Sequence, residues 1–127
     1  MAETEESKTS GLYNLSFLEE MDDAEYASEV LDLFLTLTPT ALDEIKDLTF
    51  REEWKEVFRK AHSLKSGLGI LQMQPMLETI TQIEANAKAQ ENTDAIESLL
   101  QQAFQQYELV KPMLEAELES SRKKVVL

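Results

Sequence analysis

Residues 54–71 read WKEVFRKAHSLKSGLGIL, and this stretch decides how the rest of the chain is interpreted. Its apolar residues recur every three or four positions, which is the period of an amphipathic helix. The stripe consists of Phe50, Trp54, Val57, Phe58, Ala61, Leu64, Leu68 and Leu71. Thr49 and Glu52 have the spacing of a capping box, so we expect the helix to begin there.

Three further segments, at residues 23–48, 75–87 and 94–114, repeat this apolar period. Pro39 lies inside the first, and its missing amide hydrogen should bend the helix around residues 35–39 or divide it into two shorter helices. Pro112 should kink the last segment near its end. Four amphipathic helices with short connections predict an all-α fold, an antiparallel four-helix bundle.

The two ends of the chain differ from this bundle. Residues 1–10 are acidic and polar, so we expect a disordered N-terminal lead. An apolar patch at residues 12–18 predicts a short extra N-terminal helix lying across one end of the fold. Residues 120–127 are expected to form a frayed tail, which leaves residues 11–119 for the bundle domain. Since the chain begins with Met1, we expect a complete, single-domain protein.

The composition narrows the function classes. The net charge of −13 argues against nucleic acid and anionic membrane surfaces, and is compatible with a basic or mixed protein partner. The absence of cysteine excludes disulfides and thiolate zinc sites. No signal peptide and no window near the roughly 20 apolar residues of a membrane span is present. We therefore expect a cytoplasmic protein.

His62 is the only histidine, so sites that need two histidines, including HExxH and carboxylate di-iron centres, are excluded. No glycine-rich nucleotide-binding motif is present. At 100° per residue, His62 lies roughly 120° from the centre of the apolar stripe. Its side chain should therefore lie on the flank of the helix and face solvent.

The residues after His62 favour a chemical role for it. Lys65 and Ser66 lie one helical turn further on, and Lys65 would place a cation beside a phosphoryl group carried by the imidazole. Ser66, Gly67 and Gly69 are small and would leave the histidine uncovered for a bulky partner. Two structural alternatives remain open: the glycines permit a tight helix crossing, or the helix ends early, near Ser66.

The segment AHSLKSG at residues 61–67 resembles the A-H-x-L-K-G-[SA] signature of histidine-containing phosphotransfer (HPt) domains. The resemblance extends through nearly the whole chain. Phe34 to Leu42 resembles the family's F-L-x-x-x-P-x-x-L run, Ile83-Glu84 resembles a Leu-Glu pair, and Lys88 lies where a basic residue is common. Two positions depart from the family pattern, because Ser66 and Gln72 replace the usual glycines.

The resemblance implies a shuttle that accepts a phosphoryl group from one receiver-domain aspartate and gives it to another. It implies that His62 is the phosphoacceptor and that Lys65 stabilises the phosphoryl group. The neighbours that would contribute to the site or to receiver docking are Ser66, Gly67, Gly69, Glu84 and Lys88. Response-regulator receiver domains and a hybrid histidine kinase are the implied partners. We expect no cofactor or metal on this chain, Mg²⁺ on the receiver domain, and a monomer.

Four other readings compete with this one, and the first, a metalloenzyme bundle, is disfavoured by the single histidine. A histidine kinase dimerisation domain commonly has an acidic residue after its histidine, where this chain has Ser63, and needs an ATP-binding domain. A chemotaxis-type domain joined to a kinase is harder to exclude by fold. A helical bundle that only docks a receiver domain or kinase is the main alternative. We expect a phosphocarrier rather than a conventional enzyme, without kinase activity. The cognate partners, the signal and the direction of transfer stay open.

Overall fold

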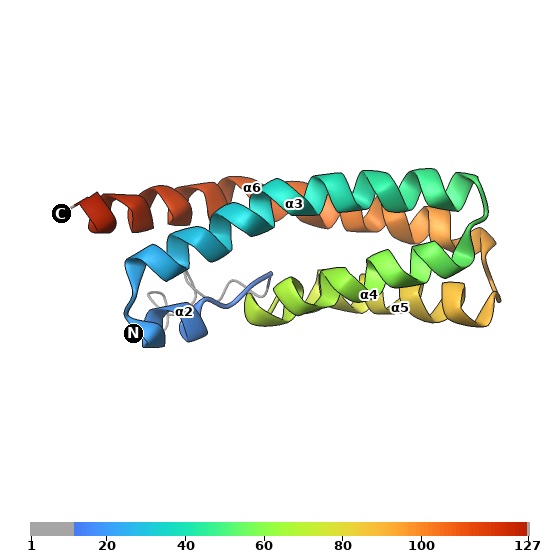
Figure 1. Ribbon diagram of the computed structural model, residues 1–127, viewed down its shortest axis with the longest axis horizontal. Coiled ribbons are helices and arrows are strands. Elements are labelled where there is room, and N and C mark those ends of the chain that lie inside the picture. The colour runs from blue at the N-terminus through green and yellow to red at the C-terminus, as the bar shows by residue number, and fades with distance from the viewer. Residues whose placement is uncertain (1–11, 127) are drawn as a thin grey trace.

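The computed structural model describes residues 12–126, which form five α-helices and no strand. The helices are α2 (Ser16–Met21), α3 (Ala24–Phe50), α4 (Trp54–Ile70), α5 (Gln74–Ala89) and α6 (Asp94–Val126). The long helices α3 and α6 form one layer, and α4 and α5 form the other, with α2 beyond the end of the α4–α5 pair (Figure 1). This arrangement confirms the predicted all-α bundle with a short N-terminal helix. The lead expected at residues 1–10 lies outside the described residues.

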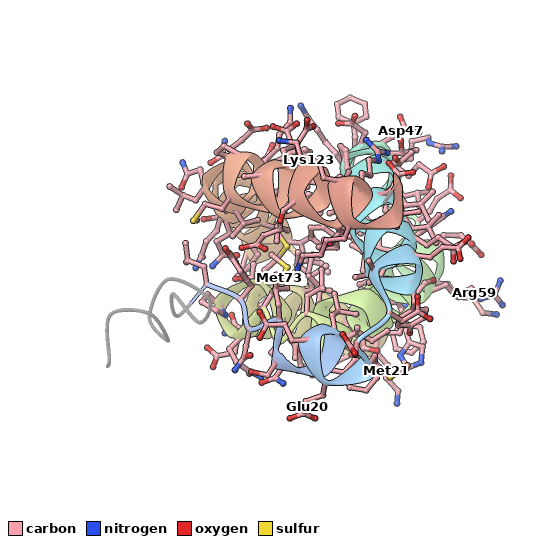
Figure 2. The ribbon with its side chains drawn as sticks, turned by 90° about the vertical axis from the view of Figure 1, so that its left-hand side faces the viewer. Glu20, Met21, Asp47, Arg59, Met73 and Lys123 are labelled. Carbon is pink, nitrogen blue, oxygen red and sulfur yellow. The ribbon has the colours of Figure 1, made fainter. Side chains whose placement is uncertain are left out.

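The core lies between the two layers and is built from one apolar stripe per helix. Packing these stripes against each other is the main source of helix stability in water. In the end-on view of Figure 2, Arg59 and Lys123 project outwards, whereas Met73, only 1% exposed, is in the core. Residues with no exposed surface include Leu42, Ile45, Val57, Ala61, Leu68, Leu71, Ile80, Ile83, Ile96, Ala103 and Leu114.

α3 continues through Pro39, so the alternative of two shorter helices is wrong. Proline has no amide hydrogen, which leaves the Leu35 carbonyl without its usual helical donor. The hydroxyl of Tyr107, on α6, donates to that carbonyl oxygen at 3.0 Å. Burial, and then the charges of Glu108 and Glu115, raise the pKa of Tyr107, so its phenol stays protonated at neutral pH. The proline is therefore accommodated by a hydrogen bond between the two long helices.

Replacement of this tyrosine tests its role in the bundle. Tyr107→Phe should lower the free energy of unfolding by about 1–2 kcal/mol, because the Leu35 carbonyl loses its donor. Urea denaturation followed by circular dichroism measures the change. Tyr26→Phe is a matched control, since the Tyr26 hydroxyl makes no hydrogen bond within residues 12–126. Equal losses in both variants would contradict a specific role for Tyr107.

The predicted capping box is wrong, because Thr49 still belongs to α3 and α4 begins only at Trp54. The backbone closes α3 instead: the amide of Glu53 donates to the Leu48 carbonyl at 3.0 Å, and the amide of Glu52 to that of Thr49. Glu52 takes the left-handed conformation of this C-terminal motif, with φ of 56°. Phe50 consequently lies on α3, is 87% exposed and does not belong to the α4 stripe.

The same C-terminal motif closes α4, and one of the two departures from the family pattern lies in it. The amide of Met73 donates to the Leu68 carbonyl at 2.9 Å, and that of Gln72 to the Gly69 carbonyl at 3.1 Å. Gln72 adopts a φ of 50°, which glycine reaches without steric cost. The replacement of the usual glycine by Gln72 therefore affects the helix end.

The frayed tail predicted for residues 120–127 is also wrong over the part that the structure describes, because α6 runs on to Val126. Leu118 is buried, and Arg122 lies 3.4 Å from the Asp32 carboxylate of α3. The first half of α3 extends beyond the α4–α5 pair and gives the end of α6 a helix to pack against (Figure 1). Along residues 12–126, no helix combines the length and apolar character needed to cross a membrane.

Candidate functional site

His62 lies in the middle of α4 with 65% of its side chain exposed, as its helical position predicted. Its Nδ1 atom lies 2.5 Å from Oε2 of Glu84, on α5. Because a carboxylate only accepts hydrogen bonds, this contact places a proton on Nδ1. Nε2 has no hydrogen-bond partner within residues 12–126. In the neutral imidazole, Nε2 therefore presents its lone pair to solvent.

Glu84 joins His62 to Lys65. Its other carboxylate oxygen, Oε1, lies 2.7 Å from Nζ of Lys65, and the residue is only 9% exposed. Burial raises the pKa of Glu84, but the hydrogen bonds and charges of Lys65 and His62 together outweigh burial and hold that pKa below its ordinary value. Glu84 is therefore a carboxylate at neutral pH, and each of its oxygens has its own partner.

The packing of α4 against α5 produces this cluster. His62 and Lys65 are one turn apart on α4, next to the buried Ala61. Glu84 follows Ile83, whose side chain belongs to the core stripe of α5. Glu84 consequently lies at the edge of that stripe, on the side that faces α4. The resemblance to the family had placed Glu84 near the site, and the structure shows that it bonds both neighbours.

Lys88 lies near the cluster but contacts a different residue. Its ammonium group is 5.9 Å from the centre of the Phe58 ring. Phe58 in turn stacks on the imidazole of His62, with ring centres 5.8 Å apart and an angle of 23° between the planes. Sequence reasoning assigned Phe58 only to the core. Its position four residues before His62 was the signal that could have identified it.

Ser66 and Gly67 face the other flank of α4. They line a groove of about 510 Å³ between α3 and α4, whose walls include the exposed leucines Leu33 and Leu37. The Ser66 hydroxyl donates a long hydrogen bond of 3.4 Å to the Ser63 carbonyl. The structure thus separates Ser66 and Gly67 from Glu84 and Lys88, because the two groups lie on opposite sides of His62.

The glycines do not serve a tight helix crossing. A Cβ atom at Gly67 or Gly69 would meet no neighbouring atom within 4 Å. The helix does not end near Ser66 either, since α4 continues to Ile70. Gly69 lies with Phe17 and Ile70 around a shallow depression next to α2. Both structural alternatives for the glycines are therefore wrong, and the small residues leave open surface beside the site.

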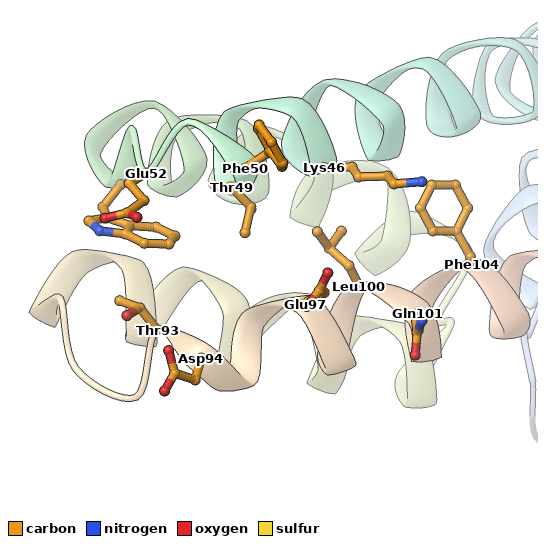
Figure 3. Close-up of a pocket in the computed structure, with 11 residues that line it drawn as sticks. Lys46, Thr49, Phe50, Glu52, Thr93, Asp94, Glu97, Leu100, Gln101 and Phe104 are labelled. Carbon is orange, nitrogen blue, oxygen red and sulfur yellow. The ribbon is translucent and has the colours of Figure 1, made fainter.

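A second cleft, of about 540 Å³, lies between α3 and α6 (Figure 3). Aromatic Phe50 and Phe104 and the carboxylates of Glu52, Asp94 and Glu97 line it. It shares no lining residue with the cluster around His62. Among residues 12–126, no three histidine, aspartate or glutamate side chains are grouped closely enough to hold a metal ion.

The fold and the site define a class: a helical bundle that exposes one imidazole, oriented by a buried carboxylate from the next helix. The sequence model of one family, the Hpt domain, matches residues 29–120. The match covers most of the 127 residues, so the chain belongs to the Hpt domain family. Its general role is therefore histidine phosphotransfer in two-component signalling, in which such domains interact with receiver domains or kinases. No curated protein matches the chain.

Proposed function

We propose that this chain carries a phosphoryl group on Nε2 of His62 and relays it between the aspartates of receiver domains. The observation that supports the proposal most strongly is the orientation of the imidazole. Nδ1 is held at 2.5 Å by the buried Glu84 carboxylate, and Nε2 faces solvent. A protein that only docked a partner would have no need of this arrangement.

The proposed step is an in-line displacement at phosphorus. The Nε2 lone pair of His62 attacks the phosphorus of an aspartyl phosphate, the P–O bond breaks, and the aspartate carboxylate leaves with the electron pair. The ring then carries a positive charge, because the Nδ1 proton stays in place. Glu84 stabilises that charge through its hydrogen bond. In the onward step a second aspartate attacks, and the imidazole leaves as the neutral form that started the cycle.

The remaining charge on the phosphoryl group needs cations. An ammonium group has three donors, and the Lys65 ammonium uses one of them on Glu84. The others remain for the phosphoryl oxygens, which agrees with the role that the resemblance implies for Lys65. We assign the Mg²⁺ ion and the aspartates to the receiver domain. The chain would then act as a phosphocarrier without kinase activity of its own.

For docking, we propose the α4 flank that bears His62 together with the groove between α3 and α4. Ser66 and Gly67 form one wall of this groove, and exposed Leu33 and Leu37 form the other. A receiver domain that covers its apolar surface would bring the phosphoaspartate over the small residues beside the imidazole. The contact should be modest in area, because a relay must release its partner. We also propose that the chain is a monomer and that it acts in the cytoplasm.

A transfer assay tests this function. A labelled, phosphorylated receiver domain from the same organism is mixed with the chain in the presence of Mg²⁺. We expect phosphate on the chain that is labile in acid and stable in base, as phosphohistidine is. If no receiver of that organism labels a well-folded sample, the relay proposal fails and the docking-only reading takes its place.

A further inference from the structure

We infer that Phe58 is a positioning residue for phosphoryl transfer: its ring holds the plane of the His62 imidazole so that Nε2 points at the incoming phosphorus. This inference rests on the proposed function and adds a residue to it. Phe58 belongs to the apolar stripe of α4, but its side chain is only partly buried. Its ring stacks on the imidazole of His62.

The hydrogen bond to Glu84 does not orient the imidazole by itself. It constrains the position of Nδ1, yet coupled changes in the χ1 and χ2 torsions of His62 can still turn the ring. Such a turn would move Nε2 away from the direction of attack, and the 65% exposed side chain has few other contacts to oppose it. The Phe58 ring lies nearly parallel to the imidazole, at 5.8 Å and 23°, and blocks this rotation on one face.

Lys88 contacts the Phe58 ring and so helps to hold it against the imidazole. Its ammonium lies 5.9 Å from the centre of the Phe58 ring, within the range of a cation–π interaction. Lys88 and Glu84 are one turn apart on α5, so a single helix supplies the hydrogen bond to the imidazole and the cation that holds the stacking ring. Lys88 forms no ion pair within residues 12–126, which leaves its ammonium free for this contact.

A small phosphodonor separates orientation from docking. Phosphoramidate needs no receiver surface: its P–N bond breaks as Nε2 of His62 attacks phosphorus, and ammonia leaves. We expect Phe58→Leu to slow this reaction roughly three- to tenfold, the range of a lost aromatic contact. Phe58→Tyr keeps the ring and should retain the wild-type rate. Lys88→Met keeps the aliphatic stem and should slow the reaction by about twofold.

Spectra of the His62 imidazole distinguish a positioning role for Phe58 from a merely structural one. Nitrogen-15 spectra of the His62 ring report which nitrogen bears the proton, and carbon relaxation of the ring reports its motion. In Phe58→Leu we expect the proton to stay on Nδ1 while ring motion increases. Thermal unfolding of the same sample checks that the bundle is intact, and Phe58→Met replaces it if the leucine variant does not fold.

Different results would overturn the positioning role of Phe58 and the proposed relay function. Suppose that the wild type is labelled and that the Phe58→Leu variant reacts with phosphoramidate at the same rate, with no increase in the motion of the His62 ring. This result would overturn the positioning role of Phe58 but would not affect the relay proposal. A wild type that neither phosphoramidate nor a receiver domain labels would refute the relay. Equal slowing in Phe58→Leu and Phe58→Tyr would also overturn the inference, because the tyrosine retains the aromatic ring.

Discussion

His62→Gln should abolish phosphoryl uptake from a receiver domain while the bundle stays folded. The chain has no other histidine, and a glutamine amide has no nucleophilic nitrogen. The side chain is 65% exposed, and Glu84 keeps its ion pair with Lys65 in the variant. We therefore expect the free energy of unfolding to change by no more than about 1 kcal/mol.

Transfer from a labelled receiver domain, followed by gel electrophoresis, measures this loss, and urea denaturation measures stability. Glu97→Gln serves as the control, since Glu97 is exposed on α6 and lines the cleft that is separate from the site. If the His62→Gln variant is still labelled, the phosphoacceptor is a residue other than His62. A loss of several kcal/mol would instead show that His62 is part of the structural core.

Glu84→Gln should slow phosphoryl uptake by about ten- to a hundredfold. The change removes the charge that stabilises the cationic ring, and a hydrogen bond to a charged group contributes about 1.5–3 kcal/mol. Each 1.36 kcal/mol corresponds to a factor of ten in rate. The amide also leaves Lys65 without its carboxylate partner. The initial rate with phosphoramidate measures the effect without any contribution from docking.

Glu97→Gln is a matched control, because it makes the same chemical change at an exposed position outside the site. Its rate should equal that of the wild type. The pH dependence of stability gives a second reading. Since the pKa of Glu84 is lowered by folding, the stability it contributes is present above the ordinary glutamate pKa and is lost as the pH falls through the lowered value. Glu84→Gln should lack that loss. Equal rates of phosphorylation by phosphoramidate in Glu84→Gln and Glu97→Gln would contradict the role of the Glu84 carboxylate.

Much of the fold could be predicted from periodicity, because each helix buries one apolar stripe. The helix ends were less accessible. Glu52 and Gln72 take left-handed conformations that usually indicate glycine, so the backbone motifs closing α3 and α4 leave no signal in the sequence. The end of α6 was missed for another reason. Its polar residues pack beside α3, and only the assembled bundle shows that α3 extends far enough to support them.

The site could be predicted only along one helix. The positions of His62 and Lys65 follow from helical geometry, and the exposure of His62 followed with them. The contact with Glu84 depends on the register of α5 against α4, which no local pattern specifies; the residue was suggested by family resemblance alone. The contact of Phe58 with His62 was not predicted, because an apolar residue in a helical stripe is usually assigned to core packing.

We propose that Nε2 of His62 receives the phosphoryl group while Glu84 keeps the proton on Nδ1. The most direct test is a phosphorus–nitrogen correlation spectrum of the nitrogen-15-labelled chain after transfer from a receiver domain. We expect phosphorus coupled to Nε2 of His62 and a proton retained on Nδ1. Phosphorus coupled to Nδ1, or phosphate on a residue other than His62, would contradict the account.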